Sequence, residues 1–172
     1  LTLAPSSASI ADLEAAGIDR VAHWARGVDL DAFHPDHRQG PAALALRERL
    51  APRGETIVGY VGRVAPEKGL ERLRALQGTK GVQVVVVGDG PGMAAARRAL
   101  APLGAVFLGQ RTGAALAAAY AALDVFVHTG AEETFGQTLQ EAAAAGLPVV
   151  APRAGGPIDL VDHGITGFLY EP

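Results

Sequence analysis

The chain is 172 residues long, with 49% hydrophobic and 19% charged residues, which fits one globular domain with a sizeable core and argues against disorder. Its formal net charge of −3 excludes the strongly basic surface of a typical nucleic-acid-binding domain. The absence of cysteine excludes disulfide scaffolds, thiolate zinc sites and cysteine nucleophiles, and agrees with a cytoplasmic location. There is no apolar run of about 18 residues that could span a membrane. Residues 1–5 contain neither an initiator Met nor a basic signal region, so we expect a piece of a longer chain.

The first forty residues differ in pattern from the rest. We expect a short strand at Leu1–Ala4, a helix capped by Ser6 or Ser7 that ends near Gly17, and a strand at Val21–Arg26. Residues 27–40 are irregular and predict a linker. A helix should follow from Pro41 to Leu50, since Pro52 stops it.

From residue 56 onward, short β-branched runs alternate with Gly-rich loops and Ala-rich helical stretches. The predicted strands are Thr56–Val61, Val82–Val87, Ala105–Leu108, Val125–His128 and Pro148–Ala151. The predicted helices are Gly69–Leu76, Pro91–Ala101, Gly113–Leu123 and Phe135–Ala145. The strands are apolar throughout, as expected when helices cover both faces of a parallel sheet. The pattern therefore predicts a three-layer, Rossmann-like α/β domain with a parallel sheet of about six strands.

Ligands of such sheets bind beyond the carboxyl ends of the strands, so the loops that follow the strands are the place to look for a site. Arg63 and Lys68 share the loop after the first of these strands. A planar guanidinium and a point charge together suit a diphosphate, although an ordinary solvated loop with Glu67 as partner fits the same residues. Gly155-Gly156-Pro157 could open a helix with a second anion site, or simply form a tight turn.

Two carboxylates lie near the start of the predicted helix Phe135–Ala145. Thr134 with Gln137 makes a plausible capping box, which places Glu133 just before the helix and Glu141 one turn beyond Gln137. Residues 134–141 would span roughly 10 Å, enough to contact both the sugar end and the ribose end of one nucleotide sugar. A solvated acidic helix face is the alternative interpretation.

Other features of the sequence give weaker indications of chemistry. Asp29-Leu30-Asp31 has the form of some metal sites, but it lies in the predicted linker, where Asp31 would cap a helical turn. The run from Gly88 to Gly92 lacks the third glycine position of a dinucleotide fingerprint. Neither a P-loop nor a hydrolase nucleophile elbow occurs in the sequence. His128, at a strand end, is a minor candidate because of its place on this edge, since such a histidine is more often a packed or capping residue than a catalyst.

Taken together, several motifs resemble the donor-binding C-terminal half of GT-B-fold retaining glycosyltransferases of family GT4. They are Gly27-Val28-Asp29, Phe33-His34-Pro35, Gly62-Arg63, Glu67-Lys68-Gly69, Val87 to Pro91, Glu133-Thr134-Phe135-Gly136, Glu141-Ala142 and Gly146 to Val150. The similarity runs from about residue 22 to residue 172. The stretch from His128-Thr129-Gly130 through Gly155-Gly156-Pro157 further resembles actinobacterial GDP-mannose-dependent α-mannosyltransferases that build mannolipids.

This resemblance implies a role for each matching residue. Arg63 and Lys68 would bind the donor diphosphate and stabilise the leaving nucleotide. Glu133 would hold hydroxyls of the transferred sugar, and Glu141 would hydrogen-bond the ribose. The full implied set, with Glu133, Arg63 and Lys68 as the catalytic residues, is Gly62, Arg63, Lys68, Gly109, Gln110, Arg111, Glu133, Thr134, Phe135, Gly136, Gln137 and Glu141.

The resemblance also implies a division of the chain and a reaction. Residues 1–22 would be the last strand and helix of an N-terminal acceptor domain, residues 23–40 a linker and residues 41–172 the nucleotide-sugar-binding domain. The implied donor is GDP-mannose, with a UDP-sugar as an option, and no metal or cofactor is expected. The parent enzyme would work at the inner face of a membrane, and this chain alone would be inactive. A nucleotide-sugar epimerase and a non-catalytic Rossmann-type interaction module are the alternatives.

Overall fold

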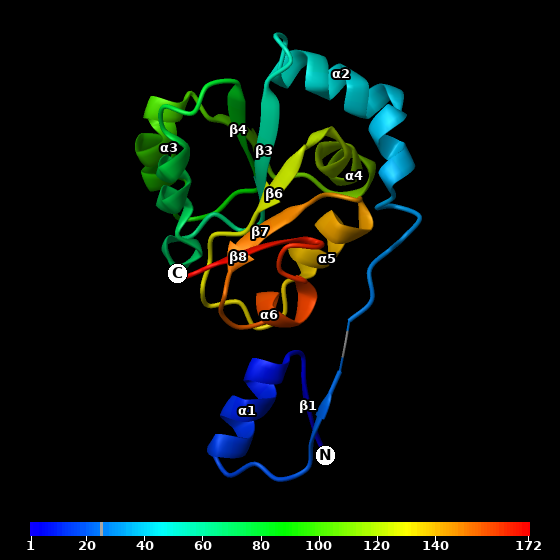
Figure 1. The fold of residues 1–172 in the computed structure, drawn as a ribbon, viewed down its shortest axis with the longest axis vertical. Coiled ribbons are helices and arrows are strands. Elements are labelled where there is room, and N and C mark those ends of the chain that lie inside the picture. Colours follow the sequence, from blue (N-terminus) through cyan, green and yellow to red (C-terminus); the bar gives the residue numbers. More distant parts are fainter. Residues whose placement is uncertain (25) are drawn as a thin grey trace.

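A six-stranded parallel sheet forms the centre of the molecule. The computed structural model describes residues 1–24 and 26–172 (Figure 1). The strand order is β5-β4-β3-β6-β7-β8, and every neighbouring pair is parallel. The strands are β3 (Thr56–Val61), β4 (Val82–Val87), β5 (Val106–Gly109), β6 (Val125–Val127), β7 (Val149–Pro152) and β8 (Gly167–Tyr170). This is the doubly wound order, in which the chain reverses direction across the sheet between β3 and β6.

Helical layers cover both faces of the sheet, as predicted. One face packs against α2 (Pro41–Leu50), α4 (Gly113–Ala122) and α5 (Gln137–Ala144), with Tyr120 and Phe126 among the fully buried residues. The other packs against α3 (Met93–Leu100) and the 3₁₀ helix η3 (Leu70–Leu76), with Leu73 and Val86 in its core. Figure 1 shows α3 and α4 on opposite sides of β3 and β4. Alternate residues of β3 and β4 supply the two cores, as the period of a strand requires.

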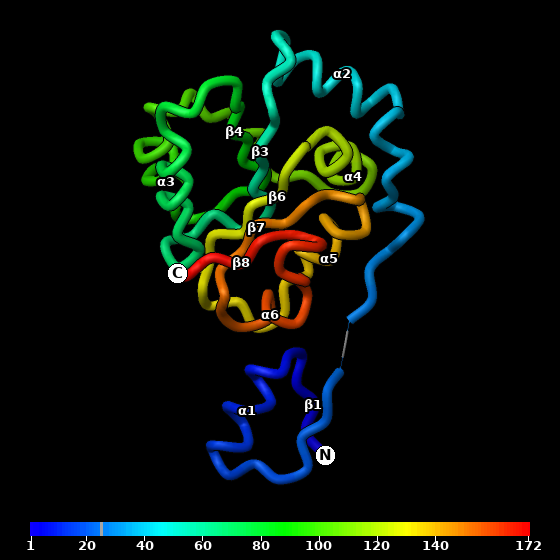
Figure 2. Tube along the Cα trace, in the orientation of Figure 1, coloured from blue at the N-terminus to red at the C-terminus, as the bar shows by residue number. Residues whose placement is uncertain are grey.

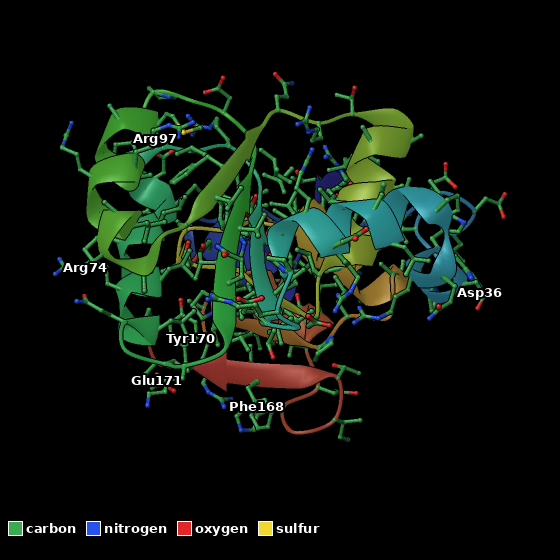
Figure 3. The ribbon with its side chains drawn as sticks, turned by 90° about the horizontal axis from the view of Figure 1, so that it is seen from above. Asp36, Arg74, Arg97, Phe168, Tyr170 and Glu171 are labelled. Carbon is green, nitrogen blue, oxygen red and sulfur yellow. The ribbon has the colours of Figure 1, made fainter. Side chains whose placement is uncertain are left out.

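The five predicted strands are all present, within one or two residues. The sixth, β8, was not located from the sequence because its four residues alternate between buried and exposed at the sheet edge. Phe168 of β8 is 60% exposed, and Figure 3 places it on this outermost strand beside Tyr170 and Glu171. The apolar content of β8 alone therefore could not distinguish this strand from a loop.

Several helix predictions need correction. The predicted helix Gly69–Leu76 is the 3₁₀ helix η3, preceded by the shorter 3₁₀ helix η2 (Pro66–Lys68). Its leucines recur every third residue, which matches the three-residue turn of a 3₁₀ helix. Pro91 lies outside α3, which starts at Met93 and runs into the 3₁₀ helix η4 (Ala101–Leu103). Gly155 and Gly156 do precede a helix, α6 (Pro157–Leu160), but it has only four residues.

The capping box was also wrong. Helix α5 begins at Gln137, its N-cap is Gly136 with a φ of 94°, and no side chain caps it. Thr134 is exposed two residues earlier. A left-handed glycine at position 136 turns the chain immediately before the helix, so Thr134 lies too far back to cap it.

The N-terminal residues form a separate small unit, visible below the main sheet in Figure 2. Strands β1 (Thr2–Ala4) and β2 (Val21–His23) pair in parallel around α1 (Ser7–Ala15), which Ser6 caps. The predicted strand Val21–Arg26 is shorter than expected, and its residue 25 lies outside the described residues. The unit contacts the main body where Asp159 of α6 accepts hydrogen bonds from the Ser7 backbone N–H (2.6 Å) and hydroxyl (2.5 Å).

The segment predicted as a linker contains the 3₁₀ helix η1 (Pro35–Gln39), and α2 then spans the predicted residues 41–50. The assignment of residues 1–22, 23–40 and 41–172 to three functional parts stays a prediction. Asp36 and Arg74 lie at the outer surface in Figure 3, whereas the guanidinium of Arg97 lies 4.5 Å from the centre of the Phe107 ring. Within residues 1–24 and 26–172, no helix combines the length and apolar character needed to cross a membrane.

Candidate functional site

The carboxyl ends of β3, β4 and β5 border a cleft of about 480 Å³. Its lining includes five residues predicted from the sequence and further residues from the ends of β4 and from α5. The predicted ones are Gly62, Arg63, Gln110, Arg111 and Glu141, and the others include Gly88, Asp89 and Thr138. A Cβ on Gly88 would lie 1.9 Å from the Gly62 carbonyl oxygen, so only glycine lets these two loops approach this closely. The cleft therefore lies beside the chain reversal, where sheets of this type bind ligands.

Next to this cleft, the loops after β3 and β6 meet through an ion pair. Lys68 Nζ donates to Glu133 Oε2 at 2.9 Å, and both side chains are less than one-fifth exposed. The Lys68 carbonyl accepts from the Thr129 hydroxyl at 2.5 Å, and Arg72 donates to the Thr129 carbonyl at 2.8 Å. The two loops are 65 residues apart in sequence, so the pair depends on β3 and β6 being neighbours in the sheet.

The second oxygen of Glu133 faces the backbone at the start of α5. Glu133 Oε1 accepts from the N–H groups of Phe135 (3.4 Å) and Gly136 (3.2 Å). Burial would raise the pKa of Glu133, but the hydrogen bond and charge of Lys68 outweigh it and hold the pKa below its ordinary value. Glu133 is therefore ionised at neutral pH, with donors on both oxygens.

His128 lies behind this pair. It is 2% exposed, and its Nε2 lies 3.6 Å from Glu133 Oε2. Burial lowers the pKa of His128 to about 4, although the charge of Glu133 opposes this change, so the ring is neutral at pH 7. The sequence marked His128 only as a minor candidate, and its distance from Glu133 was not predictable from position alone.

Arg63 lies on the exposed side of the site. Its guanidinium is paired with Glu67 one helical turn along the loop, and its side chain is 59% exposed. The Tyr60 hydroxyl donates to the Arg63 carbonyl at 2.8 Å, which closes the loop after β3. The solvated pairing with Glu67 is thus present, and it leaves the guanidinium at the edge of the cleft.

Glu141 faces the cleft from α5. Its Oε2 accepts from the hydroxyl of Tyr120 at 2.8 Å, and Tyr120 is fully buried in α4. Burial raises the pKa of Glu141, while the hydrogen bonds from Tyr120 and Gln137 act in the opposite direction. The sequence did not indicate Tyr120 as part of the site, since a tyrosine in an Ala-rich helix is typical of an ordinary core residue.

The remaining predicted residues divide into two groups. Gln110 and Arg111 are exposed at the cleft after Gly109, which ends β5 with a φ of 71°. Phe135 and Gly136 are buried beside Glu133, whereas Thr134 is exposed. Gln137 donates to the Gly27 carbonyl at 3.4 Å, which links α5 to the segment before α2. Most of the predicted residues therefore lie along one edge of the sheet. Among the described residues, the Thr134 side chain makes no hydrogen bond.

The D-x-D motif acts as a local turn. Asp29 Oδ1 accepts from the N–H groups of Asp31 (3.0 Å) and Ala32 (2.9 Å), so Asp29 rather than Asp31 caps the turn. Across residues 1–24 and 26–172, no group of three or more His, Asp and Glu side chains is arranged to hold a metal ion. Independence from metal stays a prediction.

A doubly wound parallel sheet with a cationic and an acidic loop at its reversal point is typical of open α/β domains that bind a ligand at the carboxyl ends of the strands. The sequence model described as glycosyl transferases group 1 matches residues 55–172, and the chain belongs to this family. The family that the motifs indicated is thereby confirmed.

Two curated proteins and one crystal structure are similar to most or all of this chain. The chain is 49% identical over 171 residues to a GDP-mannose-dependent alpha-mannosyltransferase of Corynebacterium glutamicum, covering 99% of this chain and 40% of that protein. It is 52% identical over 168 residues to the protein of the same name from Mycobacterium tuberculosis, covering 98% and 43%. The crystal structure of Anabaena Alr3699/HepE in complex with UDP and glucose superposes with a TM-score of 0.86 at 30% identity, covering 100% and 49%. The chain thus spans less than half the length of these relatives.

Proposed function

We propose that this chain binds the nucleotide-sugar donor of a retaining hexosyltransferase, and that the donor is GDP-mannose. In the longer protein, mannose would pass to a lipid or saccharide acceptor. The observation that carries the proposal is the Lys68–Glu133 pair at the chain reversal, beside a cleft lined by Arg63 and Glu141. The identity of about half to mannosyltransferases that use GDP-mannose supports the choice of donor.

The chemistry follows from charge. A glycosyl group leaves a nucleoside diphosphate as negative charge builds on the phosphate oxygens, and fixed cations lower the energy of that charge. Arg63 and Lys68 lie at the end of β3, and in this proposal they supply both cations, so binding requires no metal. Glu133, held on both oxygens, would orient hydroxyls of the sugar, and Glu141 would accept from the ribose.

Calorimetric titration with GDP, UDP and ADP side by side tests the proposal. We expect GDP to bind most tightly, and binding to persist in excess chelator. UDP is the second candidate, because a structural neighbour at 30% identity is a complex with UDP. An interaction module would bind none of the three nucleotides, and a requirement for magnesium or manganese would contradict the charge argument.

Substitution of the two cations tests the site itself. Lys68→Ala and Arg63→Ala should each weaken GDP binding by about 1.5–3 kcal/mol, the range for hydrogen bonds to charged groups. Guanosine, which lacks the diphosphate, should bind almost unchanged. Arg153→Ala, at an exposed pair with Glu171, is the matched control and should change neither affinity. Equal losses for GDP and guanosine would mean that the cations only support the fold.

A further inference from the structure

His128 has a buried ring that the proposed roles do not use. The side chain is 3% exposed, and among the described residues neither ring nitrogen makes a hydrogen bond of ordinary geometry, although the Gly130 backbone lies close enough to favour the protonated ring and so raise its pKa. A buried polar group without a partner destabilises a fold, and such groups are uncommon in native proteins. An unpartnered histidine at this position therefore calls for a reason.

The carboxylate oxygen nearest to His128 already accepts a hydrogen bond from another residue. Nε2 of His128 lies 3.6 Å from Glu133 Oε2, the oxygen that accepts from Lys68 Nζ at 2.9 Å. Gly130 packs against both Lys68 and His128. A Cβ at this position would lie 3.2 Å from Lys68 Cδ and 3.6 Å from His128 Nε2. One carboxylate oxygen is thus bonded to Lys68 and lies just outside hydrogen-bond range of a second nitrogen, that of His128.

The neutral ring can act only as a donor toward this oxygen. A carboxylate repels the lone pair of an unprotonated nitrogen, so the tautomer with hydrogen on Nε2 is the favoured one. The pKa of His128 near 4 keeps the ring uncharged at pH 7, so it adds no positive charge beside Lys68. His128 can therefore hold Glu133 without competing for an anionic ligand.

A bound diphosphate changes the partners of Lys68. In the proposed function, the Lys68 ammonium turns its donors toward phosphate oxygens, which weakens its hydrogen bond to Glu133. Oε2 would then be a mostly buried carboxylate oxygen without a donor, which is costly. A movement of less than about 1 Å would bring His128 Nε2 into hydrogen-bond range of that oxygen.

We propose that His128 is a positioning residue that hydrogen-bonds Glu133 Oε2 when a nucleoside diphosphate draws Lys68 away, so that Glu133 stays oriented toward the sugar. This inference rests on the proposed function, because it requires Lys68 to contact the diphosphate. No proton is transferred. The step exchanges one hydrogen-bond donor for another on the same oxygen.

The first experiment follows the ring nitrogens of ¹⁵N-histidine-labelled chain by NMR, with the His128 signals assigned from His128→Gln. Titration with GDP should shift the Nε2–H proton of His128 downfield, as expected for a stronger hydrogen bond. Guanosine should leave it unchanged. Because the chain has five histidines, the other four provide an internal reference.

A ligand-free variant separates this inference from the proposed function. Lys68→Met removes the competing donor, so its His128 Nε2–H signal should already lie near the GDP-bound position without any nucleotide. Arg63→Met, which also removes a cation but does not contact Glu133, should resemble the unsubstituted chain. An unmoved His128 signal in Lys68→Met overturns the inference whether or not GDP binds. Failure of GDP to bind the unsubstituted chain would instead overturn the proposed function.

Substitution of His128 supplies a second readout. His128→Phe should weaken GDP binding about tenfold, because Lys68 then leaves Glu133 without a replacement donor. His128→Gln retains an N–H donor and should recover most of that loss at equal thermal stability. Loss of affinity in both variants in proportion to loss of stability would assign His128 to packing alone.

Discussion

Tyr120 illustrates how one buried hydroxyl can set the direction of a carboxylate at the site. Its O–H donates to Glu141 Oε2 at 2.8 Å from the adjacent helix α4. Gln137, one turn earlier on α5, is a second hydrogen-bonding neighbour of this carboxylate. If Glu141 binds ribose hydroxyls, its orientation relative to the cleft depends on Tyr120.

We therefore expect Tyr120→Phe to weaken GDP binding about fivefold to tenfold while leaving 2′,3′-dideoxy-GDP unaffected, because only the ribose contact is disturbed. Glu141→Ala should abolish the preference for ribose altogether. Calorimetry with both nucleotides measures the two effects, and the dideoxy nucleotide is the internal control. A ribose preference that survives in Glu141→Ala would refute the assignment of Glu141.

At the amino ends of the strands, away from the candidate site, the single carboxylate of Asp124 stabilises the fold. It accepts from the Ile57 N–H at 2.8 Å and pairs with Arg38 and with Arg47 (3.0 Å). Burial would raise the pKa of Asp124, but these three donors outweigh it and hold the pKa below its ordinary value. One residue thus links η1 and α2 to the starts of β3 and β6.

Asp124→Asn should reduce the free energy of unfolding by about 2–3 kcal/mol at pH 7, since two partly buried arginines lose their counter-charge. A carboxyl with a lowered folded pKa stabilises above its unfolded pKa, and this contribution is lost as the pH falls through the folded value. The difference between the two proteins should therefore be constant above about pH 5 and shrink in stronger acid. Urea unfolding of both proteins at pH 7 and pH 3 measures this difference in the free energy of unfolding. An equal difference at both pH values would contradict the charge mechanism.

At the scale of elements, the loop between β7 and α6 supports the loop between β6 and α5. Gly155 has a φ of 61°, and a Cβ there would lie 2.3 Å from the Glu133 carbonyl oxygen. Gly156 N–H donates to that same oxygen at 2.7 Å. The Gly-Gly pair is therefore required by close packing against the Glu133 backbone, and it does not simply start the short helix α6.

Gly155→Ala should consequently destabilise the chain and weaken GDP binding. Gly164→Ala is a matched control because Gly164 also has a positive φ, 83°, but has no atom within 4 Å of its Cβ position. Both variants should lose about 1 kcal/mol to backbone strain, and Gly155→Ala about 2 kcal/mol more to steric overlap. Thermal unfolding and calorimetry measure the difference. Identical behaviour of the two variants would mean that the loops can separate freely.

At the scale of the whole molecule, the proposed function gives this chain only the donor side of a transfer reaction. Its residues match 40–43% of the length of two mannosyltransferases, and its candidate site lies at the edge of a single sheet. Sugar transfer requires the acceptor to be held beside the donor in a site that excludes water. A donor-binding chain alone supplies only half of that arrangement.

We expect the 172-residue chain to bind GDP but to transfer no sugar. Incubation with radiolabelled GDP-mannose and a panel of lipid and saccharide acceptors measures transfer, with the complete Corynebacterium glutamicum relative as the positive control. Turnover comparable to that control would place the acceptor site within these residues and contradict the predicted division of labour.

Most of the central sheet followed from the sequence because its strands are mainly apolar runs bounded by glycine, proline or polar residues. Such runs are characteristic of strands covered on both faces, and the loops after them had to share one edge of a parallel sheet. This reasoning also placed Arg63, Lys68, Glu133 and Glu141 in one region. The order of motifs along the chain was sufficient to indicate the family.

The contacts that give these residues their chemistry were decided by tertiary structure. Lys68 meets Glu133 across 65 residues, and Tyr120 meets Glu141 across 21, because strand order and helix packing bring them together. His128 next to Glu133 depends on the backbone path through Gly130, and the capping of α5 depends on the positive φ of Gly136. Local patterns determine which segments become strands and helices, since they reflect burial and backbone preference along one stretch of chain. Side-chain partners depend on distances between separate stretches, which are set only when the sheet is assembled.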